Sequence, residues 1–379
     1  MTERFQIRDE RSGEAGVAKA IDALRAGRLV ILPTETVYGL GAGPAGLERF
    51  RALPRVAPFA GLTWHTHDPA DVRELLGPDA TTHHRLVERL APAGGPVRWV
   101  IERWTPHARV PSWAEANAPL AVRVPDHPIA RAVLAQVPGV AMERLSGTEL
   151  GRTLPSLREL DTPAGGVLSP AALERAGVGA VLDAGPTRFG AASTTVRLLA
   201  SDGYLVESVG ALPESRVKRA AERMVLFVCT GNTCRSPMAE AIARARLGPG
   251  FRAESAGVSA FDGDAMTAEA AQALEEMGIA ANSGGGRGAG GGGGRHRSRG
   301  LTAEMLREAD AIYALTASHR RAALAIAGPG HEERIRLLDP AGADIADPIG
   351  GPIDLYRRTA RQIAQHVDAR LAELGWTKA

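Results

Sequence analysis

Cysteine is almost absent from this chain: its 379 residues contain two, Cys229 and Cys234, both in the stretch VCTGNTCRSPMAE. A disulfide scaffold needs several cysteine pairs, so the sequence excludes that class of protein. Two cysteines five positions apart, without histidine or further cysteine at ligand spacing, also make a poor zinc site. We therefore expect no bound metal, and we predict that these cysteines are reactive rather than structural.

Long apolar runs and a strong excess of one charge are also missing. No apolar run approaches the length of a bilayer span, and the N-terminal MTERFQIRDERSGEAG is too charged for a signal peptide. The formal net charge of +2 is too small to favour nucleic acid or membrane as the main partner. The sequence therefore predicts a soluble, cytoplasmic protein with no membrane partner.

Two α/β domains are expected from the length and from the alternation of apolar runs with helical stretches. The predicted boundaries are residues 1–212 for the first domain, 213–223 for a charged helical linker and 224–379 for the second domain. Strands that alternate with helices in the second domain predict a doubly wound parallel sheet. Its glycine-rich segment 284–294 is interpreted as a surface insertion, or alternatively as a substrate-facing flap that carries the basic RHRSR.

The cysteine stretch has the pattern of a phosphate-binding loop. It follows the strand-like MVLFV and precedes a predicted helix with Ser236 at the N-cap and Pro237 at N1. Amides above a helix N-terminus favour an anion, and with Arg235 they would lower the pKa of Cys229 from about 8.5 into a range of about 3.5–7.5. Gly231 would supply the positive φ of the loop. An inert cysteine at a strand end is the alternative, whereas no Walker A motif is present.

The residues VLFVCTGNTCRSPMAE resemble the signature of the low-molecular-weight protein tyrosine phosphatases, most closely the bacterial protein arginine phosphatases. The segment DPIGGPIDLYRRT, from Asp347 to Thr359, resembles the second motif of that family. The resemblance implies hydrolysis of phosphorylated proteins without a cofactor. It makes Cys229 the nucleophile, Arg235 the phosphate clamp and Asp347 the general acid. It also implies a phosphate-binding loop formed by Thr230, Gly231, Asn232, Thr233, Cys234 and Ser236, in which Asn232 and Ser236 hold the loop and stabilise the thiolate.

Thr233 and Ile349 are the predicted specificity residues. The resemblance implies that arginine phosphatases have a threonine at the position of Thr233, where tyrosine phosphatases have a larger aliphatic residue. Ile349 stands where relatives often have an aromatic residue, which would remove stacking on an aryl substrate. Phosphoarginine is therefore preferred over phosphotyrosine. Cys234 is interpreted as loop filler, or alternatively as a resolving thiol that forms a disulfide with oxidised Cys229.

The first domain carries PTETVYGLGA, which resembles the YrdC-type threonylcarbamoyl-AMP synthases. A G-x-G-x-x-G pattern overlaps this stretch, but its glycines do not follow the strand directly, so dinucleotide binding is disfavoured. The resemblance implies a twisted α/β sheet domain, a tRNA-modification reaction that uses threonine, bicarbonate and ATP, and contact with tRNA or double-stranded RNA. The histidines at positions 65, 67, 83 and 84 are interpreted as solvated or strand-face side chains rather than metal ligands.

The nucleotide-binding motifs of the first domain depart from the family pattern. Only Arg51 and Arg55 remain positive in the segment expected to contact ATP phosphates, and Met142, Glu143 and Arg144 replace a Ser-x-Asn motif. We therefore predict an inactive or regulatory domain, which would need ATP only if it is active. The alternatives are an active threonylcarbamoyladenylate synthase and a non-catalytic RNA or nucleotide sensor. The candidate residual ligand site comprises Thr34, Thr36, Tyr38, Arg51, Arg123, Ser193 and Thr194.

Overall fold

The computed structural model describes residues 1–53, 62–144, 170–281 and 296–377. The chain divides into two compact units, Met1–Ala221 and Glu222–Ala379. Both are α/β, as the sequence predicts, and each is described by itself. The glycine-rich segment 284–294 and Arg55 lie outside the described residues.

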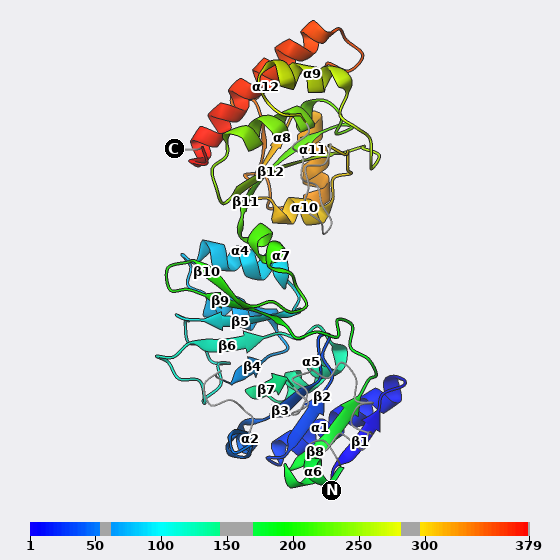
Figure 1. Cartoon of the computed structure of the whole chain (residues 1–379), viewed down its shortest axis with the longest axis vertical. Helices are drawn as coiled ribbons and strands as arrows, with labels where there is room; N and C mark the ends of the chain where they lie inside the picture. The colour runs from blue at the N-terminus through cyan, green and yellow to red at the C-terminus, as the bar shows by residue number, and fades with distance from the viewer. Residues whose placement is uncertain (54–61, 145–169, 282–295, 378–379) are drawn as a thin grey trace. The chain divides into compact units, whose positions relative to one another are not determined.

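One large mixed sheet forms the frame of the first unit, and helices flank it (Figure 1). Within the described residues, ten strands follow the order β1-β8-β2-β3-β7-β4-β6-β5-β9-β10. The strands are β1 (Glu3–Gln6), β2 (Leu29–Leu32), β3 (Gly39–Ala42), β4 (Thr63–His65), β5 (Val97–Ile101), β6 (Leu120–Arg123), β7 (Val140–Arg144), β8 (Val178–Asp183), β9 (Thr194–Leu198) and β10 (Tyr204–Ser208). The helices are α1 (Glu10–Arg25), η1 (Pro44–Gly46), α2 (Leu47–Arg51), α3 (Pro69–Leu75), α4 (Thr81–Leu90), α5 (Pro128–Gln136), α6 (Pro170–Arg175) and α7 (Glu214–Ala221).

The apolar strand β2 shows how the first unit builds its core on both faces of the sheet. Leu29 and Ile31 pack into one buried cluster, whereas Val30 and Leu32 pack into another with helices α1 and α5. Successive side chains of a strand point to opposite faces, so a continuous apolar run is what a strand covered on both sides requires. The loop that follows β2, which carries the PTET motif, is thereby held at the end of a buried strand.

Helix α7 occupies most of the predicted linker, and the prediction of a linker is wrong for this helix. Val217 and Ala220 are buried in a core cluster of the first unit. Arg85 and Arg89 of α4 donate hydrogen bonds to the carbonyls of Ala221 and Ala220. The short apolar side of α7, one valine and one alanine within a charged stretch, was too small to show in the sequence.

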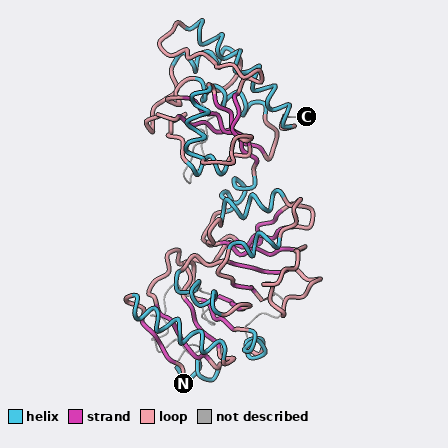
Figure 2. The backbone as a smooth tube through the Cα atoms, turned by 180° about the vertical axis from the view of Figure 1, so that it is seen from behind, coloured by secondary structure: helices cyan, strands magenta, loops and turns pink. Residues whose placement is uncertain are grey.

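The second unit contains a parallel sheet in the order β12-β11-β13-β14, and this confirms the predicted doubly wound fold. Figure 2 shows the strands of this unit surrounded by helices. Its strands are β11 (Arg223–Cys229), β12 (Phe251–Gly257), β13 (Ala311–Ala314) and β14 (Ile335–Leu337). Its helices are α8 (Arg235–Arg246), α9 (Ala268–Glu276), α10 (Ala303–Glu308), α11 (Ala317–Ala327) and α12 (Ile353–Leu374). The chain leaves β11 for β12 on one side and later returns to β13 on the other. The carboxyl end of β11 is therefore a topological switch point, where open α/β sheets bind ligands.

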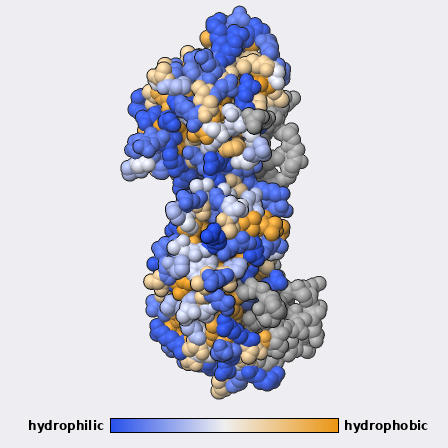
Figure 3. Space-filling view, turned by 90° about the vertical axis from the view of Figure 1, so that its left-hand side faces the viewer, coloured by the Kyte–Doolittle hydropathy of each residue, from blue (hydrophilic) through white to orange (hydrophobic). Residues whose placement is uncertain are grey.

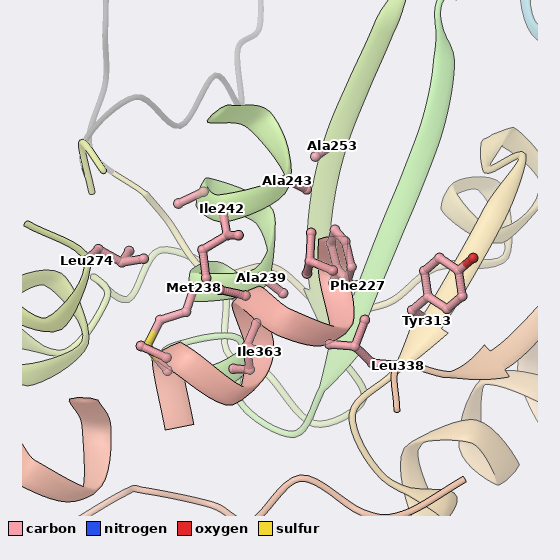
Figure 4. Packing of buried hydrophobic residues seen from close by; sticks show 14 of the residues in the cluster. Phe227, Met238, Ala239, Ile242, Ala243, Ala253, Leu274, Tyr313, Leu338 and Ile363 are labelled. Carbon is pink, nitrogen blue, oxygen red and sulfur yellow. The ribbon is translucent and has the colours of Figure 1, made fainter. Parts of the chain in front are cut away.

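Strand β11 also separates the two halves of the core of this unit. Val225, Phe227 and Cys229 face a cluster built with α8, α9 and α12, part of which Figure 4 shows around Phe227. Met224, Leu226 and Val228 face the opposite cluster with α10 and α11. This period of two places the side chain of Cys229 on the α8 side of the sheet, directly before the loop that enters that helix.

Among the described helices, none combines the length and the apolar content needed to cross a bilayer. Figure 3 shows apolar residues scattered among hydrophilic ones over the visible face of each unit. Such scattered apolar residues are normal for a protein surface.

Candidate active site

The loop from Cys229 to Arg235 connects the carboxyl end of β11 to the N-terminus of α8. Two amides of the segment after β12 fix its first residues, because Val258 N donates to Cys229 O and Ser259 N donates to Thr230 O, at 2.9 and 3.0 Å. The open N–H groups at the start of a helix favour an anion. The loop therefore has the predicted position over a helix N-terminus.

Two local details of the loop differ from the sequence prediction. The positive φ lies at Asn232, with a value of 56°, and not at Gly231. Asparagine tolerates the left-handed region because its short polar side chain can form local hydrogen bonds. Helix α8 begins at Arg235 with Cys234 at the N-cap, so Ser236 is an interior residue of the first turn rather than the cap.

Cys229, Ser236 and Asn232 form a buried hydrogen-bonded chain. The Asn232 amide donates from Nδ2 to Ser236 Oγ at 2.9 Å and to Ser255 Oγ at 2.8 Å. Ser236 Oγ lies 2.9 Å from Cys229 Sγ. Ser236 accepts from Asn232, and its one proton can point either to the sulfur or to Ala256 O, which lies at a longer 3.4 Å. A hydroxyl proton that points at the sulfur stabilises a thiolate. The geometry places Asn232 and Ser236 where the resemblance implied that they act.

The pKa of Cys229 departs from the prediction. The side chain is only 3% exposed, and burial raises its pKa above the ordinary value. The Ser236 hydroxyl, the backbone amides of Ser236 and Asn232, and Arg235 all act in the opposite direction without overcoming burial. The predicted lowering of the Cys229 pKa is therefore wrong for this structure. The sequence pattern indicated the favourable dipoles of the loop, but it did not show how deeply the thiol is buried.

Arg235 and Asp347 come together across a long stretch of chain. Arg235 Nη2 forms a partly buried ion pair with Asp347 Oδ2, and Nη1 donates to Ile345 O at 3.0 Å. Arg235 Nε is buried and has no hydrogen-bond partner among the described residues. The side chain of Asp347 remains 39% exposed. The structure therefore brings the predicted clamp and the predicted acid to one place, with part of the arginine fork still free to bind.

The predicted specificity residues lie on the rim of the site. Thr233 is half-buried, and its carbonyl accepts from Thr267 N at 3.0 Å. Ile349 is 58% exposed on the loop that carries Asp347. Sequence reasoning missed Phe261, which is 83% exposed on the segment that contacts the loop through Ser259. The aromatic residue in the stretch SAFDGD was the signal in the sequence that could have marked it.

Cys234 lies in the apolar core rather than in the solvent. Its Sγ is 3.6 Å from Thr267 Oγ1 and 3.8 Å from Tyr356 OH. Both cysteines are free thiols in this structure. Its packing agrees with the interpretation as loop filler, and the disulfide with Cys229 stays a prediction.

Further polar residues, which the sequence did not mark as part of the site, hold Asn232. His296 Nε2 donates to Asn232 O at 2.8 Å, and Arg299 N donates to Asn232 Oδ1 at 3.0 Å. Ser255 Oγ in turn donates to the buried carboxylate of Glu240. The motif HRSR therefore supports the loop from within, since His296 and Ser298 are buried, and its described residues do not form an exposed flap.

His319 is a further buried group that the sequence did not reveal as part of the site. Its Nε2 lies 2.8 Å from Thr230 Oγ1, and its Nδ1 lies 2.9 Å from Thr316 Oγ1 at the N-cap of α11. Burial, together with Arg235, lowers the pKa of His319 to about 4. The ring is therefore neutral at neutral pH and joins the loop after β11 to α11 without adding charge.

The first unit has a cavity of about 270 Å³ at the predicted residual ligand site. Thr34, Tyr38, Arg123 and Ser193 line it, as predicted. Thr36 contributes indirectly, because its Oγ1 accepts from Arg123 Nη2 at 2.7 Å. The cavity also contains His65, whose pKa burial lowers to about 3. His65 and His83 are both buried, so the solvated alternative is wrong for these two histidines.

Two residues of the predicted site lie elsewhere. Thr194 is fully buried, and its Oγ1 donates to Leu212 O at 2.6 Å and accepts from Gly210 N at 2.9 Å. Its neighbour Thr195 lines the cavity instead. Arg51 is half-exposed on α2 and lies 3.9 Å from Glu48, outside the described lining. The alternation of side chains along β9 explains the exchange of Thr194 for Thr195, because only one of two successive residues faces the cavity.

The comparisons with known proteins agree with this division of the chain. Residues 224–378 match the family model for low molecular weight phosphotyrosine protein phosphatase, and residues 22–206 match the Sua5, YciO and YrdC family model, described as telomere recombination. The chain thus belongs to both families, as a fusion of one domain from each.

Individual relatives show the same two parts. The protein-arginine-phosphatase of Geobacillus stearothermophilus is 36% identical over 152 residues, which are 39% of this chain and 93% of the relative. The low molecular weight protein-tyrosine-phosphatase PtpB of Staphylococcus epidermidis is 31% identical over 147 residues, which are 38% of this chain and 94% of the relative. The threonylcarbamoyl-AMP synthase of Methylococcus capsulatus is 36% identical over 141 residues, which are 35% of this chain and 73% of the relative.

Proposed function

We propose that residues 222–379 hydrolyse phosphoarginine in proteins through a phosphocysteine intermediate. The observation that carries this proposal is the arrangement of Cys229 at the end of β11, with Ser236 Oγ 2.9 Å from its sulfur and Arg235 on the same loop. The family supports phosphatase chemistry, and the relatives include both arginine and tyrosine phosphatases.

In the first step, the thiolate form of Cys229 attacks phosphorus through Sγ while the bond from phosphorus to the leaving nitrogen breaks. The leaving group takes a proton from Asp347, and the loop amides with Arg235 hold the phosphoryl oxygens. In the second step, water attacks phosphorus, the sulfur–phosphorus bond breaks and Asp347 takes the proton of the water. Inorganic phosphate and the thiolate are the products, so one carboxyl group serves both steps. The phosphate oxygens would take over the part of the arginine fork that Asp347 holds here.

Thr233 and Ile349 favour arginine over tyrosine as the residue that carries the phosphoryl group. The half-buried Thr233 leaves space and a hydroxyl beside the loop, which suits a planar guanidinium and the attacking water. The exposed Ile349 offers no ring for aryl stacking. Phe261 is an exposed aromatic side chain on the segment that contacts the loop through Ser259. Its ring offers stacking to an aryl substrate, so the effects of Thr233 and Ile349 must outweigh it if arginine is preferred.

Replacing Thr233 with isoleucine is expected to lower the ratio of kcat/KM for phosphoarginine peptides to that for phosphotyrosine peptides by about 10-fold or more. One extra or missing methylene in a pocket changes such ratios by about 10- to 200-fold. The measurement is phosphate release from matched peptide pairs. Thr377→Ile, which changes an exposed threonine near the C-terminus, is the matched control and should leave the ratio unchanged. An unchanged ratio in Thr233→Ile would remove Thr233 from the account of specificity.

We further propose that the first unit does not make threonylcarbamoyl-AMP. Among the described residues that line its cavity, Glu143 brings a carboxylate, and Met142 covers Gly39 and Gly41. Arg123 is already paired with the buried Glu35, and Arg51 lies outside the lining. A triphosphate would thus meet the carboxylate of Glu143 and, among the three arginines of the lining, an Arg123 that is already paired, which disfavours ATP. Contact with tRNA or double-stranded RNA stays a prediction.

The purified chain is therefore expected to release no pyrophosphate from ATP when threonine and bicarbonate are added. The measurement is a coupled pyrophosphate assay, with an active synthase such as the relative from Methylococcus capsulatus as the positive control. Threonine-dependent release at a rate comparable to that control would establish the alternative, a chain with two enzymatic activities.

A further inference from the structure

The first turn of helix α11 contacts both loops that carry the proposed chemistry. In this turn His319 Nε2 lies 2.8 Å from Thr230 Oγ1, in the loop after β11. Ala317 N in the same turn donates to Asp344 Oδ1 at 2.6 Å. Asp344 stands shortly before Asp347 in the chain. This turn therefore touches the loop of the proposed nucleophile and the segment that leads to the proposed acid.

Thr230 is held in two directions. Its carbonyl accepts from Ser259 N at 3.0 Å, after β12, and its hydroxyl meets His319 of α11, after β13. Strands β12 and β13 lie on opposite sides of β11, so the two contacts hold the loop from both sides. Threonine has few χ1 rotamers, so a fixed hydroxyl also fixes the backbone of its residue. The two contacts therefore set the direction of the first amides of the loop, because the N–H of a trans peptide points away from its C=O.

His319 forms this bridge as a buried, neutral ring. The residue is only 4% exposed, and its Nδ1 lies 2.9 Å from Thr316 Oγ1 at the N-cap of α11. Burial and then Arg235 lower the pKa of His319, against the opposite effects of Asp347 and Asp344. A neutral imidazole has one donor and one acceptor, which two hydroxyl groups match because each of them can donate or accept. The ring thus has both of its hydrogen bonds complete and joins the N-cap firmly to the loop.

We propose that His319 is a positioning residue for phosphoryl transfer, which directs the loop amides toward the phosphoryl oxygens through its hydrogen bond to Thr230. The ring itself needs no contact with the substrate. This role rests on the proposed function, since these oxygens belong to the phosphoryl group that Cys229 receives. Stabilisation of the transition state depends on donors that are in place before the reaction, so a loop amide that turns away lowers kcat.

The variants His319→Asn and His319→Gln separate the two sides of the ring. The amide nitrogen of glutamine can take the place of Nε2 beside Thr230, whereas that of asparagine can take only the place of Nδ1 beside Thr316. His319→Asn is expected to lower kcat for p-nitrophenyl phosphate by about 10-fold, the contribution of one hydrogen bond, and His319→Gln by no more than about 3-fold. Thermal unfolding is measured on the same preparations. Equal losses of kcat in both variants, in proportion to their losses of stability, would contradict the positioning role.

Thr230→Val removes the hydroxyl that His319 contacts and nearly keeps the shape of the side chain. It should lower kcat by the same factor of about 10, and the double variant with His319→Asn should be no slower than either single variant, because both changes remove one contact. The matched control is Ser318→Ala, which removes an exposed hydroxyl from the same turn, 2.8 Å from Thr316 Oγ1, and should leave kcat unchanged. Losses that add in the double variant would overturn the proposal. So would an unchanged kcat in Thr230→Val, a result that holds even if the variants of His319 do not fold.

Calorimetric titration with orthovanadate separates failure of this role from failure of the proposed function. Vanadate mimics the five-coordinate phosphorus of the transition state, and its binding needs no turnover. His319→Asn and Thr230→Val should bind it about 10-fold more weakly than the unmodified chain, and His319→Gln and Ser318→Ala within about 3-fold. Equal affinities in all these proteins would overturn the role of His319 even in an active phosphatase. The expected pattern of affinities would support this role even if phosphoarginine peptides are not hydrolysed, and absence of vanadate binding by the unmodified chain would overturn both proposals.

Discussion

Replacing Cys229 with serine is expected to lower kcat for phosphate release by at least about 10³-fold. Serine nearly matches the shape of cysteine, so the hydrogen bond to Ser236 and the loop should persist. The hydroxyl has a far higher pKa than the thiol and, in this loop, no general base lies at hydrogen-bond distance to activate it. The measurement is hydrolysis of p-nitrophenyl phosphate and of phosphoarginine peptides by the same preparations.

Cys234→Ser is the matched control for this change. Cys234 belongs to the same loop but packs against Thr267 and Tyr356, so its loss should change kcat by less than about 10-fold. Equal activity of the unmodified chain and Cys229→Ser would exclude the cysteine mechanism. Loss of activity in both variants with normal folding would instead show that the two thiols act together.

Replacing Arg235 with alanine is expected to lower kcat by about 10²–10³-fold, because the loop then lacks the charge that stabilises the phosphoryl oxygens in the transition state. Arg235→Lys should recover little of this loss. A lysine is a point charge that cannot reproduce the planar fork, which here donates to Ile345 O with one nitrogen and pairs with Asp347 through another. The measurement is kcat and KM on the same two substrates, with circular dichroism to confirm folding.

The variant Asp347→Asn distinguishes the role of Asp347 as the acid from the role of Arg235 in holding the phosphoryl group. The substitution also breaks the ion pair with Arg235, but its main effect should be on the step that protonates the leaving group. General acid catalysis of such a step contributes about 10²–10⁴-fold to the rate. A guanidine needs that proton more than p-nitrophenolate does, so the loss should be larger for phosphoarginine peptides than for p-nitrophenyl phosphate. Arg235→Ala should impair both substrates alike. Equal losses for both substrates in Asp347→Asn would remove Asp347 as the acid.

The parts of the site that lie close together in the sequence were predictable, because their geometry follows from local rules. A strand, a short loop and a helix N-terminus place Cys229, Arg235 and the loop amides together without any distant contact. The error over Gly231 and Asn232 has a different cause, which lies in distant contacts. Both residue types tolerate positive φ, and the buried partners that select Asn232 come from Ser255, His296 and Arg299, far along the chain.

Features that depend on packing between distant segments were not predictable. Burial of Cys229 beneath α8 and α12 decides the direction of its pKa shift, and no pattern in the loop encodes that depth. His319 reaches the loop from another segment, and nothing in its neighbouring residues marks it. In the first unit, the replacement of a Ser-x-Asn motif by Met142, Glu143 and Arg144 was visible in the sequence, but its placement in a cavity with Arg123 required the fold.

Trapping of the intermediate tests the central claim most directly. The full chain is mixed with a phosphoarginine peptide, quenched within the first turnover and analysed by mass spectrometry after proteolysis. The account predicts one phosphoryl group on the peptide that contains Cys229, and none on that peptide from Cys229→Ser. Release of phosphate at the normal rate with no phosphoryl group on Cys229 at any quench time would contradict it.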